Sequence, residues 1–193
     1  MPLTPSSLIY KVPLLLTALR AFLAPVVVLL ALYDPSPIGF AICLILAFFS
    51  DVFDGIIARR LGIATSFLRR LDSIADTLFY IAAVFAAWHL YPISIKENWI
   101  PLTLLAALEL TRYVFDLIKF KREASYHMWS SKLWGIFLFL GFFSLLVFGE
   151  SDFMVKLAIY VGIVADLEGV AISMVLKEIR SDIPTVFHVL RGK

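Results

Sequence analysis

Long apolar runs constrain this chain more than any other feature of its sequence. A helix needs about 20 mainly apolar residues to cross a bilayer. Six stretches approach this length, and they cover residues 12–33, 37–58, 71–91, 99–118, 133–148 and 153–176. The fifth is short, and we expect it to extend back toward Trp129. Strands of a barrel would alternate over about ten residues, whereas these stretches are continuously apolar. The sequence therefore predicts an all-α integral membrane protein with six transmembrane helices, forming a single domain over residues 1–193.

Composition supports this interpretation and excludes an ordinary soluble domain. The chain has 193 residues, of which 61% are hydrophobic and only 17% are charged. A soluble domain of this length needs more polar surface than such a composition supplies. The first apolar stretch is longer than the 7–15-residue core of a secretion signal, and it contains Arg20. We therefore expect it to be retained as a helix.

The basic residues predict how the helices are oriented. With six spans, thirteen of the basic residues fall on one side: Lys11, Arg59, Arg60, Arg69, Arg70, Lys119, Lys121, Arg122, Lys132, Lys177, Arg180, Arg191 and Lys193. The other side has only Lys96 and Lys156. Because cytoplasmic loops carry an excess of Lys and Arg, both chain ends should be cytoplasmic. We expect the protein to lie in the cytoplasmic membrane, with its basic side toward anionic headgroups or phosphates and with no nucleic-acid partner.

Four aspartates lie inside stretches that otherwise resemble membrane spans. They are Asp51, Asp54, Asp72 and Asp76. A charged side chain at the centre of a bilayer costs roughly 2.5–3.5 kcal/mol, so something cationic must offset this set. The first two aspartates are three residues apart and the last two are four apart, so each pair shares one helical face. Two such faces turned toward each other would form an oxygen-rich cage, which hard divalent cations prefer.

Small and basic residues follow the first aspartate pair. Gly55 removes a side chain beside a carboxylate, where a ligand or a second backbone needs a close approach. Ala58, one turn beyond Asp54, adds only a small side chain to the same helical face. Arg59 offers a forked cation that suits a phosphate. These residue types on neighbouring surfaces indicate a site for a metal-bound phosphoanhydride.

The spacing of these residues resembles a known family. Residues 51–76 read D-x-x-D-G-x-x-A-R, eight further residues, and then L-x-x-x-D-x-x-x-D. This is similar to the signature of the CDP-alcohol phosphotransferases, except that Leu68 stands where the family has a glycine. Residues 13–25 read P-x-x-L-T-x-x-R-x-x-x-x-P and look like the first helix of bacterial phosphatidyltransferases.

The resemblance implies a reaction and a set of roles. It implies two divalent cations, Mg²⁺ or Mn²⁺, held by the four aspartates, and a CDP-linked donor whose pyrophosphate lies on these metals. An acceptor alcohol attacks the donor, CMP leaves, and Asp76 both binds metal and takes the proton from the attacking hydroxyl. Gly55, Ala58 and Arg59 would shape the nucleotide pocket, with Thr17 contributing from the first helix. The family is commonly dimeric, so the resemblance also implies a homodimer.

The substrates are predicted less sharply than the reaction class. We expect CDP-diacylglycerol as the donor, which makes the protein a phospholipid-synthesising enzyme. Glycerol 3-phosphate and inositol or inositol phosphate remain alternative acceptors. The G-K-x-K-T pattern of glycerophosphate-accepting relatives is absent, and Ser130-Ser131-Lys132 stands in its place. An ion-coupled transporter or a non-catalytic scaffold is the alternative outside this class, although the inverted repeats typical of transporters are not found.

One group of three residues and one lysine each have two interpretations. Glu109, Arg112 and Asp116 are spaced by three and four residues, which suits a structural ladder of charges within one helix. Alternatively, Arg112 contacts the headgroup of the acceptor. Lys132 either belongs to an interfacial belt of Trp and Lys side chains or binds the acceptor.

Overall fold

The computed structural model describes residues 11–63, 65–121, 126, 128–149, 153–176 and 183–191. Within these ranges the chain is helical and contains no strand, as the sequence predicts. The first ten residues and the last two, which we expect to be cytoplasmic, lie outside the described residues.

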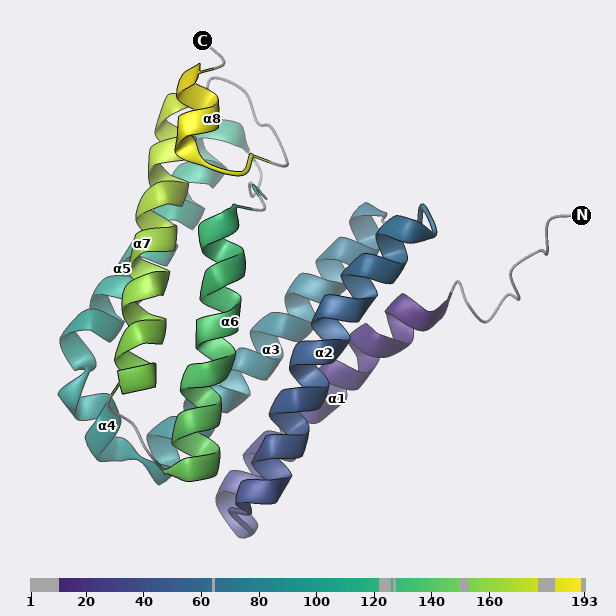
Figure 1. The fold of residues 1–193 in the computed structure, drawn as a ribbon, viewed down its shortest axis with the longest axis vertical. Coiled ribbons are helices and arrows are strands. Elements are labelled where there is room, and N and C mark those ends of the chain that lie inside the picture. The colour runs from purple at the N-terminus through teal and green to yellow at the C-terminus, as the bar shows by residue number, and fades with distance from the viewer. Residues whose placement is uncertain are drawn as a thin grey trace, which may run out of the picture. The chain divides into compact units, whose positions relative to one another are not determined.

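Eight α-helices and one π-helical segment follow each other along the described chain (Figure 1). They are α1 (Val12–Tyr33), α2 (Pro37–Arg60), α3 (Ser66–Leu90), α4 (Pro92–Glu97), α5 (Trp99–Phe120), α6 (Trp129–Phe143), η2 (Ser144–Phe148), α7 (Phe153–Val175) and α8 (Val186–Arg191). The chain falls into two compact units. Unit 1 comprises residues 1–92 and 145–149, and unit 2 comprises residues 93–144 and 150–193.

Five helical segments are long and apolar enough to cross a membrane. They are Val12–Tyr33, Pro37–Arg60, Arg70–Leu90, Trp129–Phe148 and Phe153–Val175. They correspond to five of the six predicted spans, and the fifth predicted span does extend back to Trp129. The remaining predicted span, 99–118, forms helix α5. Crossing a bilayer takes about 18 residues or more, and any stretch of α5 that long contains the three charged residues Glu109, Arg112 and Asp116. These charges set α5 apart from the apolar helices, so length and composition support five spans.

Unit 1 is built around α1, which packs against both α2 and α3 (Figure 1). The buried positions of α1 recur every three or four residues, from Pro13 through Val27 to Ala31. This recurrence places them on one face of the helix. On α3 the buried face is dominated by small side chains: Ala75, Ala82, Ala83, Ala86 and Ala87. Small side chains let two helical backbones approach closely, which is how membrane helices gain packing energy.

The turn between α2 and α3 is fixed by capping hydrogen bonds at both helix ends. At the end of α2, the Ile63 amide donates to the Ala58 carbonyl at 3.0 Å and the Gly62 amide donates to the Arg59 carbonyl at 3.2 Å. Gly62 has φ +68°, so these bonds form a Schellman cap, which favours glycine at this position. At the start of α3, the hydroxyl of Thr65 accepts from the Leu68 amide at 3.2 Å. The short connection therefore holds the start of α3 close to the end of α2.

In unit 2, α5 and α6 both pack against α7. Glycines of α7 allow the side chains of its neighbours to lie directly on its backbone. A Cβ at Gly162 would come within 2.6 Å of the Trp134 indole nitrogen and 2.9 Å of Leu105, and one at Gly169 would come within 2.8 Å of Arg112. A cluster of buried apolar side chains caps one end of this unit: Tyr126, Met128, Ile172, Leu176 and Ile183.

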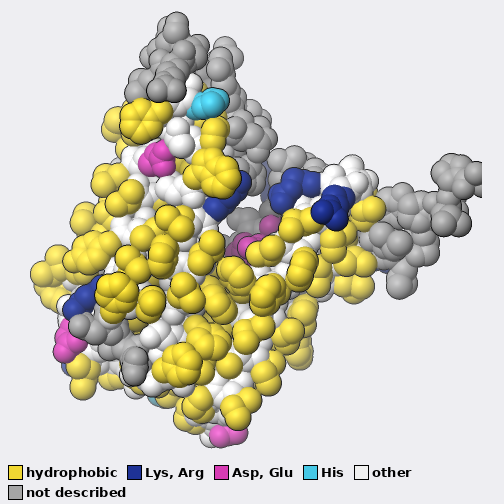
Figure 2. Space-filling view, in the orientation of Figure 1, with side chains coloured by type: hydrophobic (Ala, Val, Ile, Leu, Met, Phe, Trp, Pro, Cys, Tyr) yellow, Lys and Arg dark blue, Asp and Glu magenta, His cyan; other side chains and the backbone are white. Residues whose placement is uncertain are grey.

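Large apolar side chains are exposed on every long helix. Examples are Phe22 on α1, Ile38 on α2, Ile81 on α3, Ile118 on α5 and Met174 on α7. Figure 2 shows one face of the molecule that is covered mainly by hydrophobic side chains. A soluble monomer rarely exposes apolar patches of this extent, whereas lipid tails solvate them readily. The surface therefore supports an integral membrane protein, as composition indicates.

The packing of α7 yields a prediction that distinguishes two glycines. Gly162→Ala should lower the free energy of unfolding by about 1–3 kcal/mol, because its methyl group must push the Trp134 ring away from α7. Gly135→Ala on α6 is the matched control, because a Cβ there meets no described atom within 4 Å. It should leave stability unchanged or raise it by up to about 1 kcal/mol through better helix propensity. Thermal unfolding in detergent, followed by circular dichroism, measures both, and equal midpoints would contradict the packing.

Candidate functional site

The buried faces of the unit 1 helices change from apolar to polar along their length. On α1 the buried positions are apolar from Leu23 onward, but Thr17 and Arg20 precede them. On α2 the order is reversed, since apolar positions come first and Ser50 and Asp54 follow. Because α1 and α2 are joined by a short turn and run in opposite directions, the polar halves of their buried faces coincide. Asp72 and Asp76 near the start of α3 complete this polar end.

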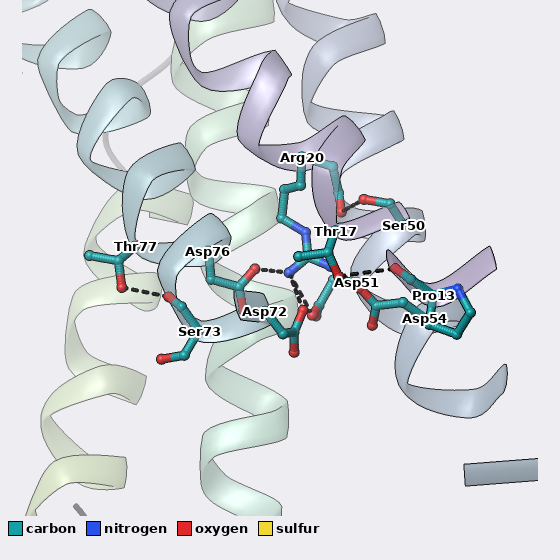
Figure 3. A network of polar contacts seen from close by, with 11 residues as sticks. Pro13, Thr17, Arg20, Ser50, Asp51, Asp54, Asp72, Ser73, Asp76 and Thr77 are labelled. Carbon is teal, nitrogen blue, oxygen red and sulfur yellow. Dashed lines mark hydrogen bonds and ion pairs between the residues drawn. The ribbon is translucent and has the colours of Figure 1, made fainter. Parts of the chain in front are cut away.

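The guanidinium of Arg20 lies at the centre of the four aspartates (Figure 3). Its Nη1 is 3.1 Å from Asp51 Oδ1 and 3.0 Å from Asp72 Oδ1, and it also contacts Asp76 Oδ1. Its Nη2 is 2.6 Å from Asp54 Oδ2. One side chain from α1 therefore bridges both aspartate pairs of the signature.

Three of the aspartates form a group that could hold a metal ion. Carboxylate oxygens of Asp51, Asp72 and Asp76 all lie within 4.8 Å of one another. Oxygen ligands that share one hard cation at 2.0–2.6 Å have separations of this order. The structure thus brings together carboxylates from α2 and α3, as the two spacings in the sequence predict.

Asp54 has different surroundings from the other three aspartates. Its side chain is only 5% exposed, whereas that of Asp51 is 48% exposed. Besides Arg20, it lies 3.4 Å from the Thr17 hydroxyl, which also donates to the Pro13 carbonyl at 3.0 Å. Thr17, for which the family resemblance implies a role in nucleotide binding, therefore lies beside an aspartate of the signature.

The charge balance of this cluster fits divalent cations. Four ionised carboxylates and one guanidinium give −4 + 1 = −3 in a largely apolar helical environment. Such an excess of negative charge is costly away from water unless further cations offset it. The available ligands are all carboxylate oxygens, which hard cations such as Mg²⁺ and Mn²⁺ prefer. The residues present therefore fit the predicted metal chemistry.

The small and basic residues that follow the first aspartate pair lie at the end of α2. Ala58 is buried, and Arg59 is exposed. The Arg59 guanidinium lies over Gly55, since a Cβ at Gly55 would be 3.4 Å from Arg59 Nη1. A Cβ at Gly55 would therefore only touch this cation in ordinary van der Waals contact, so the cation does not require glycine here.

Leu68, at the position where the signature has a glycine, lies in the first turn of α3 and is half-buried. Its amide is held by the Thr65 cap, so the backbone keeps regular helical geometry at this point. Glycine is therefore not needed at this position for the conformation of the backbone.

Arg112, a candidate acceptor contact, belongs to unit 2 and has its partner on α7. Its Nε lies 3.6 Å from Asp166 Oδ1. Asp166 is 1% exposed, and its other oxygen, Oδ2, has no hydrogen-bond partner among the described residues. The exposed Lys132 lies in the first turn of α6, with its Nζ 4.9 Å from the centroid of the Trp129 ring.

The third charged position of α5 belongs to a buried hydrogen-bond chain. The Ser173 hydroxyl donates to Asp116 Oδ1 at 2.6 Å. The Tyr126 hydroxyl lies 2.9 Å from the Ser173 oxygen and must donate, because the only hydroxyl proton of Ser173 is already used. Burial raises the pKa of the Tyr126 phenol, so it remains a donor at neutral pH. The partners of Arg112 and Asp116 therefore both lie on α7, which favours links between helices over a ladder within α5.

The motif of residues 13–25 contains Arg20, but the motif alone does not indicate a role for it. A signal was present, because an arginine inside an apolar stretch needs a buried anionic partner. Arg20 is nine residues after Lys11 and Asp51 is nine residues before Arg60, so both lie at similar distances from their helix ends. Two opposite charges at matching depths on adjacent antiparallel helices are candidates for a contact.

Comparison with known proteins supports the assignment that these contacts suggest. The family model described as CDP-alcohol phosphatidyltransferase matches residues 10–175, which include the polar ends of α1, α2 and α3. Neither a search of curated proteins nor a search of solved structures found a match.

The buried hydroxyl chain of unit 2 yields a second prediction. Ser173→Ala should lower the free energy of unfolding by about 1–3 kcal/mol, because it leaves Asp116 Oδ1 and the Tyr126 hydroxyl without their shared partner. Thr103→Ala is the control, since the exposed Thr103 hydroxyl only donates to the Trp99 carbonyl of its own helix. Its effect should stay within about 0.5 kcal/mol. Chemical unfolding in detergent separates the two, and an equal response would count against the network.

Proposed function

The chain belongs to the CDP-alcohol phosphatidyltransferase family, and on this premise we propose that it makes a phospholipid by transferring a phosphatidyl group from CDP-diacylglycerol to a small polar alcohol. The observation that carries the proposal is the convergence of two carboxylate pairs, from α2 and α3, on one point. One carboxylate would be enough to neutralise the buried Arg20, so the convergence of four exceeds what the packing of the helices requires.

The proposed reaction is a single displacement at phosphorus. The hydroxyl oxygen of the acceptor forms a bond to the phosphorus that carries the diacylglycerol, and the bond from this phosphorus to the bridging oxygen of the pyrophosphate breaks. The hydroxyl proton passes to the enzyme, and CMP leaves with the bridging oxygen. Bond formation and bond breaking balance without any oxidant or reductant.

Asp76 is the proposed base for this proton. An alcohol is a poor nucleophile unless a positioned group removes its proton. The Asp76 side chain is 33% exposed, so a ligand can reach it, and it contacts the guanidinium of Arg20. Asp54, by contrast, is almost completely buried, which suits a purely structural or ligating role.

The remaining residues of the site have proposed binding roles. Two divalent cations, Mg²⁺ or Mn²⁺, held by the four aspartates would neutralise the pyrophosphate and stabilise the leaving oxygen. Arg59 would hold a phosphate through its forked guanidinium. Gly55, Ala58 and Thr17 would leave space for the nucleotide at the polar end of α1 and α2.

The acceptor is proposed to be glycerol 3-phosphate or an inositol compound. In unit 2, Arg112 and Lys132 offer cations that suit the acceptor headgroup. We further propose a homodimer in the cytoplasmic membrane, with the active site open to the cytoplasm, where the positive-inside rule places the basic connections.

CMP release tests the proposed reaction directly. Purified protein with CDP-diacylglycerol, Mg²⁺ or Mn²⁺ and a panel of alcohols should release CMP with at least one of them. Asp76→Asn should reduce the rate by about 10²–10⁴-fold, because it removes the base and retains the shape of the side chain. Asp34→Asn, at an exposed carboxylate in the turn after α1, is the control and should leave the rate unchanged. No release with any alcohol, or full activity of Asp76→Asn, would refute the catalytic assignment.

Metal removal gives an independent prediction. Excess EDTA should abolish CMP release, because the carboxylates cannot neutralise the donor pyrophosphate themselves. Readdition of Mg²⁺ or Mn²⁺ should restore the rate, as measured on the same preparation after dialysis. A rate that survives prolonged chelation would show that the aspartates have another role.

A further inference from the structure

The position of Arg20 bears on how the cluster binds metal. Its side chain is 2% exposed, and its two terminal nitrogens contact all four aspartates. The three aspartates contacted by Nη1 are the same three whose oxygens lie close enough together to share a metal ion. An arginine nitrogen and a divalent cation therefore have the same ligands.

We propose that Arg20 is the built-in counter-ion of the aspartate cluster and that it competes with divalent cations for Asp51, Asp72 and Asp76. The inference rests on the metal-binding part of the proposed function. Without metal, the guanidinium keeps the carboxylates of α2 and α3 together. With metal, Nη1 gives up these three carboxylates, since both cations cannot occupy one set of ligands.

The fourth aspartate gives Arg20 a place to remain. Asp54 holds Nη2 at 2.6 Å and does not belong to the group of three. Arg20 Nε is buried and has no hydrogen-bond partner among the described residues, so no other bond fixes the guanidinium. Arg20 can therefore keep its contact with Asp54 while Nη1 leaves the other carboxylates. Because Arg20 must release three carboxylates before they can bind metal, it sets the affinity of the site for metal. It acts only through the aspartates and is therefore a positioning residue.

Mn²⁺ binding and thermal stability test this proposal without any substrate. Arg20→Gln should unfold at a lower temperature than the wild type in EDTA, because four carboxylates then lack a counter-ion. Mn²⁺ should raise its midpoint more than that of the wild type. Electron paramagnetic resonance of free Mn²⁺ should give a dissociation constant at least about tenfold lower for the variant, because a competing positive charge a few ångströms away is gone.

Two further variants keep the test decisive. Arg20→Lys retains one charge but cannot bridge Asp54 and the other aspartates with a single ammonium, so its Mn²⁺ affinity should lie between the other two. If Arg20→Gln does not fold, this variant decides alone. Lys96→Gln is the control, because it removes an exposed positive charge on α4, at a position that belongs to unit 2. It should bind Mn²⁺ as the wild type does.

The outcomes separate this inference from the proposed function. Mn²⁺ binding to Arg20→Gln or Arg20→Lys that equals or is weaker than wild-type binding overturns the competition, even where the wild type binds metal and releases CMP. No Mn²⁺ binding by any of the proteins overturns both the competition and the metal role of the aspartates. Tighter binding in the Arg20 variants alone, with Lys96→Gln unchanged, supports the competition.

Discussion

The contact of one buried guanidinium with four carboxylates is the interaction on which unit 1 depends. Arg20 has no access to water, and a lone charge in this environment would be expensive. Among the aspartates only Asp54 is as deeply buried, but the two aspartate pairs repel each other. Each group is tolerated because the other is present, so removing one partner leaves a buried charge uncompensated, which typically costs 3–5 kcal/mol. The site is thus part of the packing of the helices and not an addition to it.

The placement of the site follows from how the helices use their faces. On α1 and α2 a single buried stripe is apolar over one half and polar over the other. The apolar half supplies rigid packing, including the small side chains of α3, and this rigidity fixes where the polar half comes together. Catalytic groups on packed helices hold their geometry better than groups on loops. The capped turn around Gly62 adds to this precision, because it restrains α2 and α3 beside the aspartates.

Sequence patterns predicted the helices of this protein well, but they did not predict all the side-chain pairs between different helices. Apolar runs located the long helices to within a few residues, since an apolar segment of that length has few other stable conformations in a membrane. The spacing within residues 51–76 predicted the convergence of the aspartates, because helical periodicity alone puts each pair on one face. The partners of Arg20 and Arg112 were not predicted, because they lie on other helices. Such pairings depend on the rotation of one helix against another, which local spacing does not reveal. Helix α5 differs from these cases, because its charged residues Glu109, Arg112 and Asp116 are already visible in the sequence.

The arrangement of unit 1 also gives α1 an unexpected importance. Helix α1 packs extensively against α2 and α3, whereas α2 and α3 make few close contacts with each other. The two halves of the aspartate signature are therefore brought together mainly by a helix that contains none of its residues. Successive residues of a helix are rotated by about 100° about its axis. The rotation of α1 against its neighbours therefore decides whether Arg20 faces the aspartates or the lipid. The functional unit accordingly begins near Pro13, because the aspartate segment alone would lack the helix that brings its two halves together.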